Sequence, residues 1–207
     1  MTLLLATNNP HKKAEMNLIC APHTVRTPDD LGIDFHHEET GLTFSENSMG
    51  KARALAQLVF AEGSLGEETP IAVIADDSGI CVDALGGAPG VYTARFGRDE
   101  FGRQPTQEEQ NQLLLTRLEQ ASVRRAHYTC SMTALCADRS IITVEDYWFG
   151  TIAERLSSGG GGFGYDPLFI PDGMSATAAD MTNQEKHAQS HRGKATRKLL
   201  AAIAAGL

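Results

Sequence analysis

The sequence has few basic residues: 18 lysines and arginines stand against 26 aspartates and glutamates, which gives a net charge of −8. A surface that coats DNA or RNA needs a basic footprint, so this balance argues against a nucleic-acid polymer as the partner. It does not exclude a small anionic ligand, because a few well-placed cations are enough to hold one.

Long apolar runs are also lacking. None approaches the roughly 20 residues that a membrane helix needs, so we expect no membrane association. The opening segment, Met1–Leu5, is too short and lacks the basic flank of a signal peptide.

Cysteine is scarce, with four in 207 residues and no C-x-x-C pair. The spacing of zinc sites and thioredoxin-like motifs is therefore absent. We expect Cys130 and Cys136 to be buried thiols and predict a reducing, cytoplasmic setting. Apolar residues make up 42% of the chain, enough for a sizeable core. No repeat or low-complexity linker divides it, so we predict a single domain over residues 1–207.

Two adjacent carboxylates form the centre of the functional prediction. The apolar run Ile71–Ile74 indicates a short buried strand. Asp76 and Asp77 follow it, and Gly79 allows the backbone to turn. Because burying a charge without a partner is costly, this pair indicates a functional site. The alternative is a solvated loop in which Asp76 starts a turn.

A strand-to-helix turn near the N-terminus suggests phosphate binding. Leu3–Ala6 predicts a buried strand, and a helix is predicted from Pro10, which suits a first helical turn, to about Ile19. Exposed amides at a helix N-terminus attract phosphate, and Lys12 adds a point charge. The alternative is ordinary capping by Asn9 with a solvated lysine pair.

The segment from residue 36 carries possible metal ligands. His36 and His37 would point in opposite directions on a strand, so a two-histidine site is not expected. A carboxylate from Glu38 or Glu39 suits magnesium, which prefers oxygen ligands.

A helix is predicted to begin at the Thr43–Glu46 capping box and to run to about Phe60, followed by a polar loop over 62–70. Glu46 and Lys51 are either a cap and a solvated face or ligand-facing groups, and the spacing does not decide between these. A second capping box, Thr106–Glu109, predicts another helix.

A clean alternation of apolar and polar residues predicts a strand over Arg124–Ala137. Ile141–Phe149 returns as the second arm of a hairpin. Because this antiparallel pair sits among βα units, the fold is predicted to be mixed α/β.

A glycine-rich loop, Ser157–Gly164, formally matches G-x-G-x-x-G. The following Tyr165–Ile170 is strand-like rather than helical, so the dinucleotide-binding context fails. Phe163, on a glycine hinge, can stack on a base, or it only fills a gap in the core. Short helical pieces are predicted over 177–189, and a last helix from Ser190.

The order of these motifs resembles the inosine triphosphate pyrophosphatase family (Ham1-like, including the bacterial dITP/XTP pyrophosphatases). The match spans nearly the whole chain, and five ordered motifs are more specific than any one of them. Ser48 stands where alanine is expected. The motifs are Thr7-x-Asn9-x-x-Lys12-x-x-Glu15, Glu39-Thr40-Gly41-x-Thr43-Phe44-x-Glu46-Asn47, Ala75-Asp76-Asp77-Ser78-Gly79, Gly162-Phe163-Gly164-Tyr165-Asp166-Pro167 and Ser190-His191-Arg192.

This resemblance implies a long, mixed, strongly twisted sheet flanked by helices, in two lobes with a central cleft. It also implies a homodimeric, Mg²⁺-dependent enzyme. Such an enzyme cleaves non-standard purine nucleoside triphosphates (ITP, dITP, XTP, dXTP) to the monophosphate and pyrophosphate, and so cleanses the nucleotide pool.

The resemblance also implies roles for individual residues. Asp77 would be the proton acceptor, and Glu38 and Asp77 the metal carboxylates, although Glu39 lies one residue away and the register is open. Donors from Ser190–Arg192 would satisfy O6 of the base. The substrate-binding residues would be Thr7, Asn8, Asn9, Pro10, His11, Lys12, Ser78, Phe163, Gly164, Tyr165, Asp166, Lys186, His191 and Arg192.

Two other functions stay open at this point. One is a nucleotide sensor that uses the same pocket without turnover, although the intact Asp76, Asp77 and Lys12 argue against it. The other is a phosphohydrolase acting on a different nucleotide, such as a modified pyrimidine triphosphate.

Overall fold

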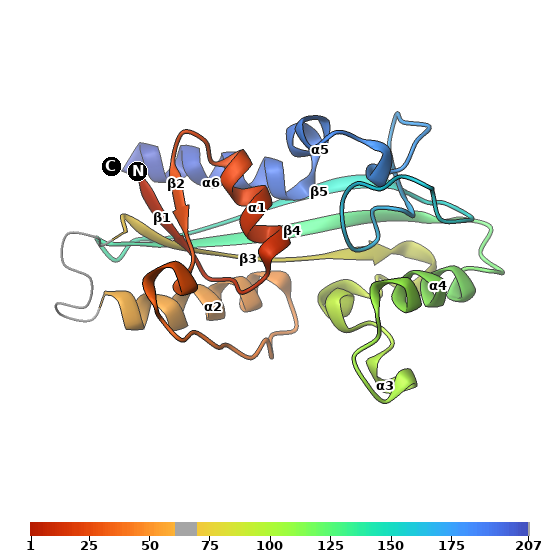
Figure 1. Cartoon of the computed structure of the whole chain (residues 1–207), viewed down its shortest axis with the longest axis horizontal. Coiled ribbons are helices and arrows are strands. Elements are labelled where there is room, and N and C mark those ends of the chain that lie inside the picture. The colour runs from red at the N-terminus through yellow and green to blue at the C-terminus, as the bar shows by residue number, and fades with distance from the viewer. Residues whose placement is uncertain (61–69, 207) are drawn as a thin grey trace. The chain divides into compact units, whose positions relative to one another are not determined.

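The computed structural model describes residues 1–60 and 70–206 (Figure 1). Six strands form one sheet in the order β2-β1-β3-β4-β5-β6. Strand β1 pairs in parallel with β2 and β3, whereas β5 and β6 are antiparallel, so the sheet is mixed and the predicted α/β class is confirmed. The strands are β1 (Thr2–Leu5), β2 (Thr24–Arg26), β3 (Ala72–Val82), β4 (Arg125–Cys136), β5 (Ile141–Ile152) and β6 (Phe169–Pro171).

The chain divides into two compact units. The first comprises Met1–Asp77, Cys130–Asp146 and Arg192–Leu207, and the second comprises Ser78–Thr129 and Tyr147–His191. The two lobes and central cleft that the family resemblance implies stay predictions.

In the first unit, helices cover both faces of the strands. Helix α2 (Phe44–Val59) contributes Leu55 on one side to a buried cluster that also holds Val73 and Leu4. On the other side, α1 (Pro10–Ile19) and α6 (His191–Gly206) contribute to a second cluster with Leu3 and Ile74 (Figure 1). Because successive strand residues point to opposite faces, a continuous apolar run serves both clusters.

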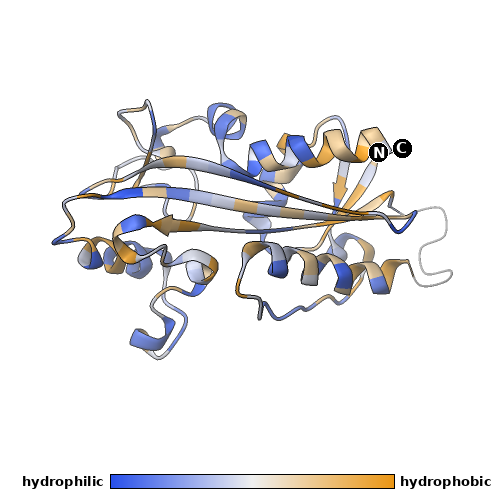
Figure 2. Cartoon of the chain, turned by 180° about the vertical axis from the view of Figure 1, so that it is seen from behind, coloured by the Kyte–Doolittle hydropathy of each residue, from blue (hydrophilic) through white to orange (hydrophobic). Residues whose placement is uncertain are grey.

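Helices α1 and α2 begin where the sequence predicts. Asn9 caps α1 with Pro10 in its first turn, and Thr43 and Glu46 form the capping box of α2. Polar and apolar residues alternate along α2 with the period of a helix, as its hydropathy colouring shows (Figure 2). The loop predicted over 62–70 lies, apart from Pro70, outside the described residues.

Strand β3 is longer than the sequence suggested. Asp76 and Asp77 lie inside it, 1% and 5% exposed, and the strand continues through Gly79 to Val82. The predicted strand end before the carboxylates was wrong, and so was the alternative of a solvated loop. Cationic partners for both carboxylates, described below, allow the strand to continue through two charged residues.

The second unit has its own core. Leu114 and Leu118, at the end of α4 (Gln107–Arg117), pack with the aromatic residues Tyr128, Trp148 and Phe169. The Thr106–Glu109 capping box of α4 is confirmed. The strand-like prediction for residues 165–170 was wrong for its first part, because the amides of Leu168 and Phe169 both donate to the carbonyl of Tyr165, as in a helical turn.

The remaining elements are short. The predicted helical pieces over 177–189 are confirmed as η5 (Ala178–Asp180) and α5 (Asn183–Gln189). The others are η1 (Pro28–Leu31), η3 (Asp83–Leu85), η4 (Gly90–Arg95) and α3 (Arg98–Phe101). Within residues 1–60 and 70–206, no helix is both long and apolar enough to cross a membrane.

Candidate active site

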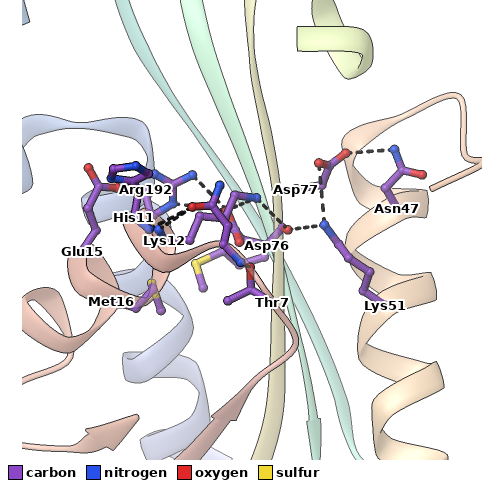
Figure 3. Close-up of polar contacts among 12 residues, drawn as sticks. Thr7, His11, Lys12, Glu15, Met16, Asn47, Lys51, Asp76, Asp77 and Arg192 are labelled. Carbon is purple, nitrogen blue, oxygen red and sulfur yellow. Dashed lines mark hydrogen bonds and ion pairs between the residues drawn. The ribbon is translucent and has the colours of Figure 1, made fainter. Parts of the chain in front are cut away.

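Asp76 and Asp77 point to opposite sides of β3 (Figure 3). This follows from the alternation of side chains along a strand. Asp76 faces Lys12 of α1 and Arg192 of α6, whereas Asp77 faces Asn47 and Lys51 of α2. The two carboxylates therefore have different partners and can have different roles.

Asp76 forms ion pairs with two cations. Its Oδ2 accepts from Arg192 Nε at 3.2 Å and Nη2 at 3.1 Å, and it lies 3.1 Å from Lys12 Nζ. Burial alone would raise the pKa of this carboxyl, but Lys12 and Arg192 outweigh burial and hold the pKa below its ordinary value. Arg192 also pairs with Glu15. Asp76 thus stays ionised and fixes both cations.

Asp77 has a different environment. Its Oδ2 accepts from Asn47 Nδ2 at 2.9 Å, and its Oδ1 lies 3.8 Å from Lys51 Nζ. Burial raises the pKa of Asp77, and the nearby cations Lys51 and Lys12 only partly oppose that. A buried carboxyl with a raised pKa is a candidate general base.

Lys51 connects the acidic groups. Its Nζ donates to the main-chain carbonyl of Asp76 at 2.7 Å and pairs with the carboxylate of Glu39. Burial would lower the pKa of Lys51, but Asp76, Asp77 and Glu39 outweigh it and raise the pKa. The ammonium is therefore charged, and the reading of Lys51 as a solvated face was wrong.

The predicted phosphate-binding turn lies at the start of α1 and is largely exposed. Asn9 Oδ1 accepts from the amides of His11 (2.9 Å) and Lys12 (3.3 Å), and the amide of Asn9 donates to Thr7 Oγ1 at 3.1 Å. Asn8 Nδ2 donates to the carbonyl of Phe35 at 3.0 Å. The capping alternative for Asn9 is thus confirmed, while Lys12 is fixed on Asp76 rather than solvated.

The second unit holds another group of predicted site residues. Asp166 Oδ2 accepts from the amide of Phe163 and from Lys186 Nζ, both at 2.7 Å. Lys186 Nζ lies 4.9 Å from the centre of the Phe163 ring. Tyr165 is buried and donates its hydroxyl to the carbonyl of Thr93 at 3.3 Å. These contacts give Phe163 a defined position on its glycine-rich loop.

The other predicted residues are placed as follows. His191 is buried and stacks on Tyr128, with ring centres 4.6 Å apart and an angle of 8° between the planes. Ser78 is half-buried on β3. Glu38 is exposed and forms no hydrogen bond or ion pair with any residue of the described part of the chain. Its neighbour Glu39 forms an ion pair with Lys51. The geometry brings Glu39, rather than Glu38, to the ammonium that faces Asp77.

The donor set fits magnesium. Asp77 and Glu39 offer hard oxygen ligands and share a contact with one ammonium. In the ranges 1–60 and 70–206 no three histidine, cysteine, aspartate or glutamate side chains are grouped as a metal cage. Magnesium is commonly held by one or two carboxylates together with substrate phosphates, so two carboxylates suffice.

Sequence reasoning missed the role of Asn47 and left that of Lys51 undecided. A signal for both was present: they lie four residues apart after a capping box, so they share one face of α2. What the spacing did not reveal was that this face meets β3 at Asp77.

The fold and the site define an α/β protein with a buried carboxylate–lysine site, and the chain matches a known family. A model described as the Ham1 family matches residues 3–202, so the chain belongs to the Ham1 family, and the resemblance found in the motifs is confirmed.

Similar proteins cover nearly the whole chain. It is 42% identical to a dITP/XTP pyrophosphatase of Pectobacterium atrosepticum, over 97% of each chain. It is 40% identical to a dITP/XTP pyrophosphatase of Treponema denticola, over 94% of each. Among solved structures, the Staphylococcus aureus Ham1 protein aligns with a TM-score of 0.83 and 32% identity over 100% of both chains. A HAM1 protein from Coxiella burnetii aligns with a TM-score of 0.80 and 33% identity, over 99% of this chain and 98% of that one.

Proposed function

We propose that this protein is a nucleoside triphosphate pyrophosphatase that acts on non-standard purine nucleotides: ITP, dITP, XTP and dXTP. The observation that carries the proposal is Asp77, a buried carboxylate held by Asn47 and faced by Lys51. Identities of 40% and 42% to dITP/XTP pyrophosphatases, over 94% and 97% of the chain, support the same activity.

The reaction follows from the chemistry of Asp77. Its carboxylate accepts a proton from water while the water oxygen bonds to the α-phosphorus. The bond from that phosphorus to the bridging oxygen breaks, and pyrophosphate leaves with the electron pair. The products are one nucleoside monophosphate and one pyrophosphate.

The cations of the first unit have supporting roles. Lys12, fixed by Asp76, presents positive charge next to the helix N-terminus, where phosphate groups are stabilised. Lys51 holds positive charge beside Asp77. Phosphoryl transfer depends mainly on positioning and charge stabilisation, so fixed cations are the expected equipment.

Magnesium is part of the proposal. Asp77 and one carboxylate of the Glu38–Glu39 pair would hold it, and the contacts of Glu39 favour Glu39. When bound, the ion neutralises phosphate charge that the carboxylates would otherwise repel.

The assembly and the setting are also proposals. The family resemblance supports a homodimer. The burial of Cys20, Cys130 and Cys136 as thiols is consistent with a reducing cytoplasm. In the second unit, Phe163 offers an aromatic ring on which a purine base can stack.

Product analysis tests the reaction. Purified protein with ITP and magnesium should give inosine monophosphate and pyrophosphate in equal amounts. Binding without any product would indicate a sensor. Orthophosphate together with accumulating inosine diphosphate would contradict attack at the α-phosphorus. A panel including ATP, GTP and modified pyrimidine triphosphates would test the substrate class.

A further inference from the structure

Helix α4 carries two neighbouring buried amides that hold different segments of the chain. Gln110 Nε2 donates to the carbonyl of Ala94 at 3.0 Å. Asn111 Nδ2 donates to the carbonyl of Gly164 at 3.3 Å. Both side chains are 4% exposed. Asn111 therefore contacts the loop that carries Phe163, and Gln110 holds another segment.

The amide of Asn111 has only one useful orientation. Turning it over would place Oδ1 against the carbonyl oxygen of Gly164, and two acceptors cannot form a hydrogen bond. In the present orientation Oδ1 is buried and accepts no hydrogen bond from any described residue. A buried acceptor without a donor is unfavourable for stability, so the bond to Gly164 is the identifiable benefit of an amide at this position.

The loop itself needs fixing. Gly162 and Gly164 flank Phe163 and both have positive φ, 72° and 69°. Glycines allow this conformation but give the unbound loop many alternatives. A Cβ on Gly162 would lie 2.2 Å from Asp166 Oδ2, so that position cannot be stiffened by a larger residue. Rigidity must come from outside the two glycines.

Three side-chain contacts contribute to this rigidity. Asp166 accepts from the amide of Phe163, Lys186 lies over the ring, and Asn111 holds the carbonyl of the next residue. The first two act on Phe163 itself. Asn111 acts on the C-terminal side of the hinge at the carbonyl of Gly164, one residue beyond the carbonyl of Phe163, which accepts from the amide of Asp166 at 3.3 Å.

We propose that Asn111 is a positioning residue for nucleobase binding: it fixes Gly164 and thereby the plane of the Phe163 ring. The inference rests on the proposed function, in which Phe163 stacks on the purine. A ring held in its binding orientation loses less freedom when the base arrives. Loosening it weakens binding of substrate and transition state alike, so KM rises while kcat is unchanged.

The first experiment is steady-state kinetics of Asn111→Ala with ITP. We expect KM to rise about fivefold, the size of one neutral hydrogen bond, with kcat within about twofold of the wild type. Asn111→Leu keeps the number and branching of the side-chain heavy atoms and lacks the donor, so it should give the same rise, and it replaces the alanine variant if that one does not fold. A fall in kcat with unchanged KM in both variants would overturn the proposal.

The matched control is Gln110→Ala, on the same helix and equally buried. It removes an amide that holds the carbonyl of Ala94, so KM should stay near the wild-type value. An equal rise in KM would mean that any damage to α4 has this effect, and the positioning role would fall.

A double-mutant cycle with Phe163→Ala shows whether Asn111 acts through that ring. Its readout is the affinity for inosine monophosphate, measured by calorimetry. Each single change should weaken binding, and the double variant should bind no more weakly than Phe163→Ala alone. Additive losses would overturn the proposal.

The cycle also separates this inference from the proposed function. If the wild type binds inosine monophosphate but releases no pyrophosphate from any purine triphosphate, the proposed function fails, and the cycle still decides the role of Asn111. If the wild type shows neither binding nor turnover, both proposals fail. Normal turnover with additive losses removes only the inference.

Discussion

Asn47 on α2 donates its side-chain amide to Asp77 on β3 over 2.9 Å, while its own Oδ1 accepts from the amide of Gly41 at 2.8 Å. The Gly41 contact fixes which end of the Asn47 amide faces Asp77. One carboxylate oxygen is thereby engaged, and the orientation of the other is set. The segment before α2, through Gly41, thus determines the orientation of the carboxylate of Asp77, the proposed general base.

The first prediction concerns this contact. Asn47→Ala should lower kcat for ITP about tenfold, because Asp77 loses its orientation and a small error in position is costly in catalysis. The matched control is Ser48→Ala. Ser48 is equally buried on the next position of α2, but its hydroxyl contacts Ser131 and Thr133, so kcat should stay near that of the wild type. Equal losses in the two variants would mean that only the packing of α2 matters.

The second prediction separates the two aspartates. Asp77→Asn should lower kcat by roughly 10²-fold or more, the scale of general-base catalysis, with little loss of stability. Asp76→Asn should instead lower the free energy of unfolding by about 3–5 kcal/mol, because it removes the buried carboxylate charge that both Arg192 and Lys12 contact. Urea unfolding and kinetics on both variants test this. A stable Asp76→Asn protein, or an active Asp77→Asn protein, would contradict the assignment.

The third prediction concerns Lys12. Lys12→Ala removes a charge that meets the phosphates in both ground and transition states, so KM for ITP should rise more than kcat falls. Lys13→Ala is the control, because Lys13 pairs with Asp30 through Nζ and Oδ1 at 2.7 Å rather than with Asp76. If kcat falls and KM does not change, Lys12 instead stabilises charge on the leaving pyrophosphate.

The fourth prediction is a pH dependence of stability at η1. The hydrogen bond from Lys13 and the amide of Thr27 lower the pKa of Asp30 to about 2. A lowered pKa means that the folded state prefers the ionised form, so the stabilisation is full above the ordinary pKa and is lost as pH falls towards 2. Asp30→Asn should therefore melt earlier than the wild type at pH 7, and the difference should vanish near pH 2. A difference that persists there would show that charge is not the cause.

The elements and the order of the motifs could be predicted from sequence because their signals are local. Capping boxes at Thr43 and Thr106 and alternation along β4 depend on neighbours a few residues apart. The path of β3 could not be predicted in this way. Asp76 stays in a strand because Arg192, 116 residues further on, reaches it, and no local pattern reports such a contact.

The site, like the fold, could be predicted only where its signals are local. Asp77 and Lys12 belong to short motifs, so they were found. Asn47 lies inside a motif that also reads as a helix start, and its contact with Asp77 spans 30 residues. The choice between Glu38 and Glu39 depends on which side chain turns towards Lys51, and in a segment without regular structure no periodicity decides that.

The last prediction concerns the metal. Because the carboxylates and the substrate are all anionic, excess chelator should abolish turnover and magnesium should restore it. Undiminished activity in chelator would remove the metal from the proposal.

A comparison of variants at Glu38 and Glu39 then identifies which of the two carboxylates binds the metal. Glu39→Gln should raise the magnesium concentration needed for half-maximal activity at saturating ITP, because Glu39 lies on the ammonium that faces Asp77. Glu38→Gln makes the same chemical change one residue away, on an exposed side chain, and should leave the magnesium dependence unchanged. Melting curves of both variants would exclude unfolding as the cause. The reverse result would assign the metal to Glu38 and would mean that residues 38 and 39 rearrange when the nucleotide binds.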